Sequence, residues 1–259
     1  MPDSEPNCRA ESSNYERAGA MGKEETDGRA ALRLRALYES LESAYGPQHW
    51  WPAKTRFEVV LGAYLTQGTA WKSVERSIAN LAERGLLSVA AIRDVPEIEL
   101  RELIRPSGYM TRKAAAIKSF VRFLDAHYEG SLETLAREKP EVVRERLLAL
   151  PGVGPETADA IRLYALGHPA IVVDEYLRRV VTRHGLVSKA AKDAEIQALG
   201  KTIFAKGAEG ERARQCNEFH ALIVKVGKQH CRRAPLCDAC PLAWDLRRSG
   251  EATGELRAG

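Results

Sequence analysis

Residues 150–158 read Leu-Pro-Gly-Val-Gly-Pro-Glu-Thr-Ala, and this stretch is the strongest indication of the fold. Gly152 and Gly154 allow the backbone to turn tightly where a side chain would clash. Pro155 suits the first turn of the helix that follows, because its missing N–H would have no partner there. The free amides at that helix start can bind a phosphate without any charged side chain. A plain connection between two helices explains the same residues, so a second observation is needed.

Asp174 is the second observation. It lies eighteen residues after Glu156, follows the apolar run 170–173 and opens a helical pattern. An aspartate at a helix start can be an N-cap and nothing more. The turn and the aspartate at this distance are together more specific than either feature alone.

Apolar side chains recur at three- and four-residue spacing through most of the chain, beginning with Leu32, Leu34, Leu37, Leu41 and Tyr45. This is the stripe of an amphipathic helix. Similar stripes follow in the segments 56–66, 72–83, 87–93, 97–104, 111–127, 140–149, 155–166, 174–184, 190–205 and 212–228. Glycines and prolines separate them. The run 170–173 is strand-like, but one short run makes no sheet, so the sequence predicts an all-α protein.

The composition excludes some classes of protein. The 259 residues suffice for one large or two small domains, and 44% hydrophobic with 29% charged residues is ordinary for a folded protein. No stretch approaches the roughly 20 apolar residues of a membrane helix, and the N-terminus lacks a signal-peptide core. We therefore expect no membrane association and a cytoplasmic, nucleoid-associated location.

The net charge of +4 is unevenly distributed. Residues 1–28 carry seven acidic and three basic side chains, which leaves +8 on the remainder. That excess suits a polyanionic partner such as nucleic acid without requiring one. Residues 1–28 are too polar to offset their chain entropy and are predicted to be disordered, with translation starting at Met1 or at Met21. A folded body over 29–230, a cysteine loop over 231–246 and a flexible C-terminus over 247–259 are expected to follow.

The turn and the aspartate together resemble the endonuclease III superfamily of DNA glycosylases, over roughly residues 30–245. The resemblance implies a two-lobed helix–hairpin–helix fold, with a central lobe over about 55–165 and a second lobe from 29–54 and 166–230. It implies that a monomer binds double-stranded DNA with a damaged base, and that Asp174 supports cleavage of the N-glycosidic bond. The hairpin residues expected to contact DNA are Gly152, Val153, Gly154 and Thr157.

Bifunctional members of this superfamily carry a lysine in the hairpin helix, which attacks the sugar and leads to strand nicking. This chain has Glu156 at that position, so the resemblance implies a monofunctional enzyme that leaves an abasic site. Two alternatives stay open: a bifunctional endonuclease III-like enzyme acting on oxidised pyrimidines, and a non-catalytic module that uses the hairpin to hold DNA. Asp174 argues against the module, because binding alone gains nothing from a carboxylate that faces DNA.

Within the superfamily, the chain is most similar to bacterial 3-methyladenine DNA glycosylases. The matching stretches include Trp50-Trp51-Pro52, Leu65-Thr66-Gln67, Arg105-Pro106-Ser107-Gly108 and Val172-Val173-Asp174. Such an enzyme flips the alkylated base, which is positively charged and attracted to aromatic faces, into a pocket. The resemblance places at this pocket Trp50, Trp51, Pro52, Trp71, Gln67 and Glu156. As an alternative, the tryptophans are core residues and Gln67 is an exposed helix glutamine.

The cysteines near the C-terminus resemble the iron–sulfur loop of endonuclease III proteins. The loop cysteines are Cys231, Cys237 and Cys240, but their spacing differs and Leu246 stands where the fourth cysteine is expected. A [4Fe–4S] cluster, zinc and a loop without metal therefore stay open, and disulfides are not expected in a cytosolic chain. The candidates for a fourth ligand are His230, Cys216 and Asp245. Arg232 and Arg233, within the loop, would suit contacts to phosphates.

Overall fold

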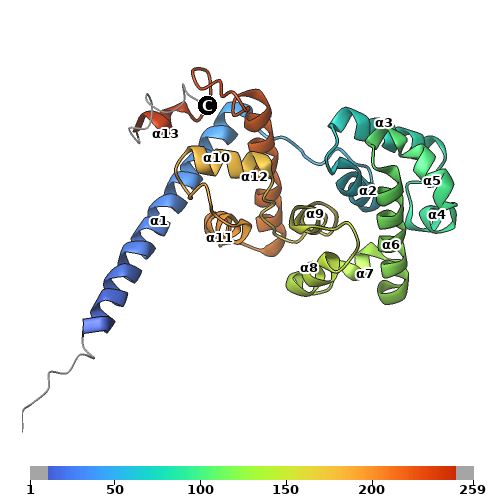
Figure 1. Cartoon of the computed structure of the whole chain (residues 1–259), viewed down its shortest axis with the longest axis horizontal. Coiled ribbons are helices and arrows are strands. Elements are labelled where there is room, and N and C mark those ends of the chain that lie inside the picture. Colours follow the sequence, from blue (N-terminus) through green and yellow to red (C-terminus); the bar gives the residue numbers. More distant parts are fainter. Residues whose placement is uncertain (1–10, 249–259) are drawn as a thin grey trace, which may run out of the picture.

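The computed structural model describes the backbone of residues 11–248 and the side chains of residues 28–246. All regular elements in this part of the chain are helices, which confirms the all-α prediction. They form two lobes that lie side by side (Figure 1). The run 170–173 is a buried irregular connection and not a strand. None of the described helices is long and apolar enough to cross a membrane.

The middle of the chain forms one lobe, which we call the central lobe. Its helices are α2 (Arg56–Thr66), α3 (Trp71–Glu83), α4 (Val89–Asp94), α5 (Glu97–Leu103), η1 (Arg105–Ser107), α6 (Met110–Tyr128), α7 (Leu132–Leu135), α8 (Pro140–Leu148), α9 (Pro155–Ala160) and the π-helical turn η2 (Ile161–Ala165). Their apolar faces enclose Tyr64, Phe120 and Leu124, which are fully buried. The lobe therefore has a hydrophobic core of its own.

Helices from the first and the last part of the described chain form the other lobe, which we call the terminal lobe (Figure 1). Its helices are α1 (Glu11–Tyr45), α10 (Glu175–Arg183), α11 (Asp193–Ile203), α12 (Glu209–Gln229) and α13 (Ala243–Arg248). A second core around Leu37, Phe219 and Leu222 holds them together. The turn η2 belongs to both lobes: Ile161 packs in the central core, Leu163 packs in the terminal core, and the chain crosses from one to the other.

Helix α1 begins at Glu11, inside the segment that the composition predicts to be disordered. That prediction is wrong for the backbone from residue 11 onward. The physical reason is that helix formation has a costly nucleus and inexpensive extension, so the packed turns near Leu34 and Leu37 support further turns upstream. Residues 1–10, which include Met1, and residues 249–259 lie outside the described residues. At the other end, α13 extends to Arg248, within the predicted flexible segment 247–259.

The lobes are also joined by a buried carboxylate at the end of α9. Asp159 is 1% exposed, and its Oδ1 accepts hydrogen bonds from Arg144 Nε (3.0 Å) in α8 and from Arg162 Nη1 (2.8 Å) in η2. Its Oδ2 accepts from Gln197 Nε2 (2.6 Å) in α11 of the terminal lobe. One carboxylate therefore holds elements of both lobes next to the turn at 150–158.

A second buried carboxylate anchors the C-terminal segment. Asp245, in α13, accepts hydrogen bonds from Arg33 Nη2 (2.7 Å) in α1 and from His184 Nδ1 (2.8 Å) at the end of α10. Burial opposes ionisation of Asp245, but these two partners outweigh it and hold the pKa of the carboxyl below its usual value. The chain that follows the cysteine loop is thereby fastened to the core of the terminal lobe.

Candidate active site

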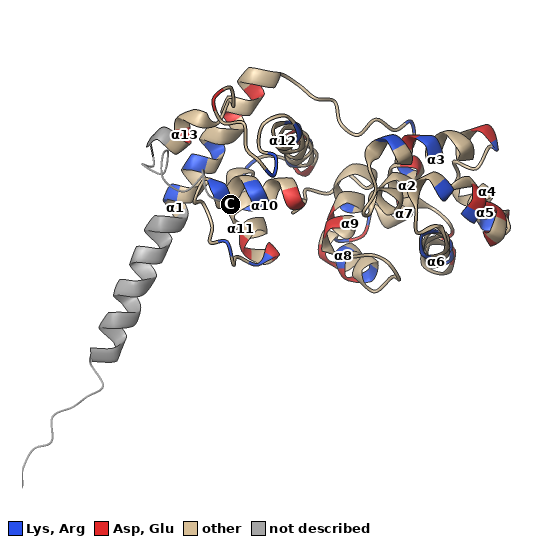
Figure 2. Cartoon of the chain, turned by 45° about the horizontal axis from the view of Figure 1, so that its top comes forward, with Lys and Arg blue, Asp and Glu red and all other residues tan. Residues whose placement is uncertain are grey.

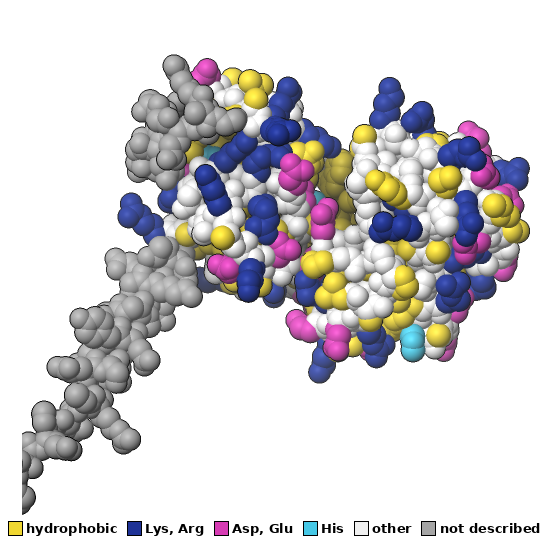
Figure 3. All heavy atoms as spheres, viewed as in Figure 1, with side chains coloured by type: hydrophobic (Ala, Val, Ile, Leu, Met, Phe, Trp, Pro, Cys, Tyr) yellow, Lys and Arg dark blue, Asp and Glu magenta, His cyan; other side chains and the backbone are white. Residues whose placement is uncertain are grey.

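A cavity of about 560 Å³ lies between the two lobes and takes its walls from both. Figure 3 shows the cleft that separates the lobes on one face of the molecule. Six of the predicted site residues lie in the cavity wall together with Thr157 of the hairpin: Trp50, Trp51, Gln67, Trp71, Glu156 and Asp174. Pro52 is exposed and does not line the cavity, so its prediction as a pocket residue is wrong.

Three tryptophans form one wall. The ring centroids of Trp50 and Trp71 are 5.6 Å apart, and those of Trp51 and Trp71 are 5.3 Å apart in an edge-to-face arrangement. Trp51 also packs 5.1 Å from the ring of Tyr164 in η2. Gly62, in α2, permits this packing, because a Cβ there would lie 3.0 Å from Cζ2 of Trp51. The indole N–H of Trp50 is buried without a hydrogen-bond partner in the described part of the chain, so the wall offers one free donor.

Asp174 lines the same cavity, at the start of α10. Its Oδ1 accepts the backbone N–H of Leu177 at 2.7 Å, so the residue is the N-cap of α10 as well as part of the cavity wall. Its Oδ2 lies 3.4 Å from Nε2 of His220 in α12. The carboxylate is about nine-tenths buried, and both of its oxygens have defined neighbours.

Glu156 is a second carboxylate in the same cavity. The side chain is exposed at the cavity mouth, yet the surrounding protein atoms raise its pKa, and the charge of Asp174 adds to this effect. The two carboxylates repel each other when both are ionised, so the cavity is best suited to a positively charged occupant.

The predicted hairpin joins α8 to α9. Gly152 has φ +76°, a conformation that favours glycine, and a Cβ there would lie 3.2 Å from Cβ of Ala116. Val153 is buried under the turn, and Gly154 is the N-cap of α9 with no side-chain hydrogen bond. The first amides of α9 are therefore not satisfied by a capping side chain, as a phosphate-binding turn requires.

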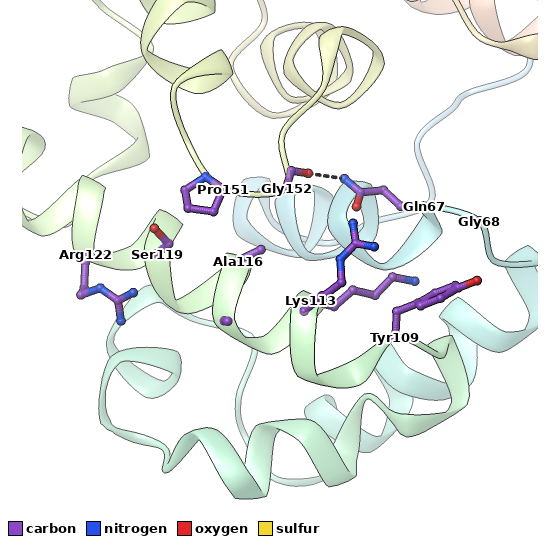
Figure 4. A pocket seen from close by; sticks show the side chains of 11 residues that line it. Gln67, Gly68, Tyr109, Lys113, Ala116, Ser119, Arg122, Pro151 and Gly152 are labelled. Atoms are coloured by element: carbon purple, nitrogen blue, oxygen red, sulfur yellow. Dashed lines mark hydrogen bonds between the residues drawn. The ribbon is translucent and has the colours of Figure 1, made fainter.

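Gln67 lies where the base-sized cavity meets the hairpin. Its amide donates to the carbonyl oxygen of Gly152 (2.8 Å) and to the hydroxyl of Thr157 (2.9 Å), and Figure 4 shows the first of these bonds. A second cavity, of about 570 Å³, opens on the other side of Gln67 along α6. Lys113 fixes the segment that carries Gln67, because its buried ammonium donates at 2.8 Å to the carbonyl of Leu65 and to the hydroxyl of Thr69.

The second cavity contains residues that the sequence did not single out. Arg112 and Arg122 of α6 line this cavity together with Pro151 and Gly152 of the hairpin, and Figure 4 shows Arg122 on this helix. Within the described residues neither arginine has an ion-pair partner. Tyr109, which precedes α6 with φ +46°, is 66% exposed at the rim of this cavity. The spacing of the arginines along one helix face is visible in the sequence, but only the fold places that face next to the hairpin.

The cysteine loop lies in the terminal lobe, outside both cavities. Cys231, Cys237 and Cys240 line a cavity of about 300 Å³ together with His230 and Leu246. Cys216 lies elsewhere, buried in the core of the terminal lobe. Among the side chains of residues 28–246, no group of three or more His, Cys, Asp or Glu residues is placed to hold a metal ion.

Arginines of α10 hold this loop in place. Arg183 donates to the Cys231 thiol (3.3 Å) and to the carbonyl of Arg233 (3.0 Å), and Arg179 Nε donates to the carbonyl of Cys231 (2.6 Å). Three thiols with a leucine in the fourth place do not fit a four-thiolate cluster, and the choice between a cluster, zinc and a loop without metal stays a prediction. Arg232 and Arg233 are exposed on the loop.

Tyr176 also lines the cavity, and it depends on a glycine of α12. A Cβ on Gly227 would lie 2.3 Å from Cδ1 of Tyr176, so replacement with alanine must displace the ring. We expect Gly227→Ala to lower the free energy of unfolding by about 1–3 kcal/mol through overpacking between α10 and α12. Thermal unfolding followed by circular dichroism measures this.

Gly210, in the same helix, is the matched control. No atom lies within 4 Å of a Cβ at Gly210, so Gly210→Ala should stabilise the helix by about 0.5–1 kcal/mol. Equal unfolding temperatures for the two variants would show that Tyr176 does not rest on Gly227.

A helical hairpin, a cavity large enough to admit a nucleobase and a carboxylate that lines it point to the class of protein: a DNA N-glycosylase of base-excision repair. Residues 61–206 match the HhH-GPD superfamily base excision DNA repair proteins, and the chain belongs to this family.

Individual relatives agree with this class. A protein of Methanocaldococcus jannaschii named as a DNA repair glycosylase is 43% identical over 208 residues, which cover 80% of this chain and 92% of that one. A thymine-DNA glycosylase of Aeropyrum pernix is 27% identical, over 83% of this chain and 93% of its own. Among solved structures, the 3-methyladenine DNA glycosylase of H. pylori bound to 1,N6-ethenoadenine is 26% identical with a TM-score of 0.66, covering 76% of this chain and 97% of that one.

Proposed function

We propose that the protein is a monofunctional DNA glycosylase that hydrolyses the N-glycosidic bond of alkylated purines flipped from double-stranded DNA. It acts as a monomer, in the cytoplasm at the nucleoid. The observation that carries the proposal is the composition of the cavity, which is lined by three tryptophans and two carboxylates. The H. pylori relative, which is named for 3-methyladenine, supports the choice of substrate.

The wall and the carboxylates favour the same kind of base. A purine methylated at N3 of adenine or at N7 of guanine is a cation, and an indole face attracts a cation by about 0.5–2 kcal/mol. The carboxylates of Glu156 and Asp174 add to this attraction. A neutral, undamaged purine gains only the stacking energy. The cavity therefore distinguishes alkylated from undamaged purines by their charge.

Cleavage of a cationic base needs little acid catalysis. The electron pair of the C1′–N bond leaves with the base, which departs neutral, and positive charge develops on the sugar. The Asp174 carboxylate stabilises this charge. An attacking water forms the new C1′–O bond and gives its proton to the carboxylate, so the product is an abasic site in an intact strand.

DNA would be held by groups that surround the cavity. The hairpin offers backbone amides to one phosphate. Figure 2 marks basic residues in α6, and Arg112 and Arg122 of this helix extend the positive surface from the hairpin. Tyr109 offers an exposed ring at the rim, where it can stack on a base.

A bifunctional reaction is the second candidate, and one observation favours it. Glu156 occupies the hairpin position of the nucleophilic lysine, but Lys228 of α12 lines the same cavity as Asp174. A lysine amine there can attack C1′ and form a Schiff base. Borohydride trapping tests this: a covalent protein–DNA adduct that Lys228→Met abolishes would establish the lyase.

A set of duplex oligonucleotides, each with one lesion, tests the proposed function. The lesions are a stable 3-methyladenine analogue, 7-methylguanine, 1,N6-ethenoadenine, thymine glycol and a thymine–guanine mismatch. Each sample is run on a denaturing gel directly and after hot alkali. Cleavage only after alkali, and only for the alkylated purines, is the expected result. Cleavage confined to the mismatch or to thymine glycol would contradict the proposed substrate class.

A further inference from the structure

His220 is a buried histidine that faces the reaction site, although no sequence motif marks it. It projects from α12, is 8% exposed, and lines the same cavity as Asp174. Its ring lies 5.8 Å from the ring of Tyr164, and its Nδ1 forms a hydrogen bond with the Tyr164 hydroxyl. Its Nε2 is buried and has no hydrogen-bond partner among the described residues.

Tyr164 determines which ring nitrogen carries hydrogen. Burial, with a further contribution from the charge of Asp174, raises the pKa of Tyr164 well above its usual value, so the phenol keeps its proton. That proton can be donated to Nδ1 of His220, which leaves the hydrogen of the neutral imidazole on Nε2. A protonated imidazole also carries hydrogen at Nε2. The remaining tautomer would place a lone pair on Nε2 near the negative charge of Asp174, whose Oδ2 lies 3.4 Å away, which is unfavourable.

The structure thus presents an N–H donor and a carboxylate side by side in one cavity wall. A buried donor without an acceptor is unfavourable, and a bound molecule that accepts its hydrogen bond would remove this cost. Because the neighbouring Asp174 oxygen only accepts hydrogen bonds, the bound molecule must accept from His220 and donate to Asp174. Water does both.

We propose that His220 is a second catalytic residue, which holds the attacking water against Asp174 through its Nε2–H. The inference rests on the proposed hydrolysis and assigns the water to a place in it. The water oxygen accepts from His220, donates one hydrogen to Asp174 Oδ2, and uses its remaining lone pair to form the C1′–O bond. As the C1′–N pair leaves with the base, the donated hydrogen passes to Asp174 as a proton. His220 keeps its own hydrogen throughout.

Two substitutions of His220 test this role, because one keeps an N–H donor at the site and the other removes it. Gln carries an N–H close to the position of Nε2, whereas Leu fills similar space with no donor. We expect His220→Leu to lower the single-turnover rate on a 7-methylguanine duplex on the order of 100-fold, as for the loss of one preorganised donor. His220→Gln should recover at least about tenfold of that loss, and affinity for a duplex with an abasic-site analogue should change little in either variant.

Tyr164→Phe provides a test that leaves His220 in place. Phenylalanine keeps the ring contacts and removes only the hydroxyl, so the tautomer of His220 is no longer fixed. The rate of base release should therefore fall, but by less than in His220→Leu. The proposal is overturned if His220→Leu keeps the wild-type rate, or if the Leu and Gln variants, both folded, lose the same activity. If His220→Leu does not fold, the Gln and Phe variants decide. Failure of the wild-type protein to release any lesion would instead overturn the proposed function.

Discussion

Asp174→Asn should lower the rate of base release by about 10²–10³-fold, because it removes the charge that stabilises the developing positive sugar. Folding should be unaffected. Asn is as good an N-cap as Asp, and its side-chain oxygen can still accept the N–H of Leu177 at the start of α10. Single-turnover excision from a 7-methylguanine duplex measures the rate, and thermal unfolding measures the stability.

Asp174→Ala separates the two roles of this residue. Alanine removes the charge and the cap together, so the variant should lose about 1 kcal/mol of stability in addition to the activity. Binding of an undamaged duplex should be retained in both variants, since Asp174 contributes no attraction to phosphates. Undiminished base release by Asp174→Asn would show that the carboxylate is only a helix cap and that the catalytic group lies elsewhere.

Asp159→Asn should be the most destabilising single change outside the active site, at about 3–5 kcal/mol, because it leaves a buried guanidinium without its charged partner. Arg162, in η2, is 7% exposed, and its ion-pair partner is Asp159 in α9. The same carboxylate also binds Arg144 of α8 and Gln197 of α11, so three elements lose a contact at once. The midpoint of thermal unfolding should fall by about 10 °C.

Asp125→Asn is the matched control for this variant. Asp125 forms a bidentate pair with Arg93 between α4 and α6, but both side chains are substantially exposed, at 32% and 43%. Exposed pairs contribute little to stability, so the unfolding midpoint should remain close to that of the wild type. Similar losses in the two variants would mean that the lobes are not held together by Asp159.

The sequence predicted the helices well because their pattern is local. The spacing of Leu32, Leu34, Leu37 and Leu41 predicts a helix without knowledge of its partner, and the last three form part of a core. Leu32 belongs to the predicted apolar stripe but is 73% exposed, so it lies outside the buried face. The hairpin glycines were recognised for the same reason, since φ +76° at Gly152 is a requirement of the turn itself. Disorder of residues 1–28 was predicted from their composition. Composition contains no information on whether a helix that packs further along the chain, here α1, extends into the segment.

The cavity was predicted less completely because it is assembled from distant segments. Trp50 and Trp71 are brought together by the path of residues 46–55, which has no regular pattern to read. Pro52 follows the tryptophans directly in sequence but lies outside the cavity, because side chains of an irregular segment point in different directions. His220 and Lys228 lie on an amphipathic helix, where the sequence alone does not distinguish a cavity-lining side chain from a core or surface one.

The tryptophan fluorescence of this protein should report mainly on the cavity between the lobes. Three of the four tryptophans in the chain lie there, with ring centroids 5.3 to 5.6 Å apart, so they share excitation energy before they emit. A nucleobase that stacks on one ring should quench the emission of all three. Trp244, hydrogen-bonded to Ser40 in the terminal lobe, supplies a constant background. Stopped-flow fluorescence without any added label can therefore time the arrival of the base in the pocket separately from the cleavage of its bond.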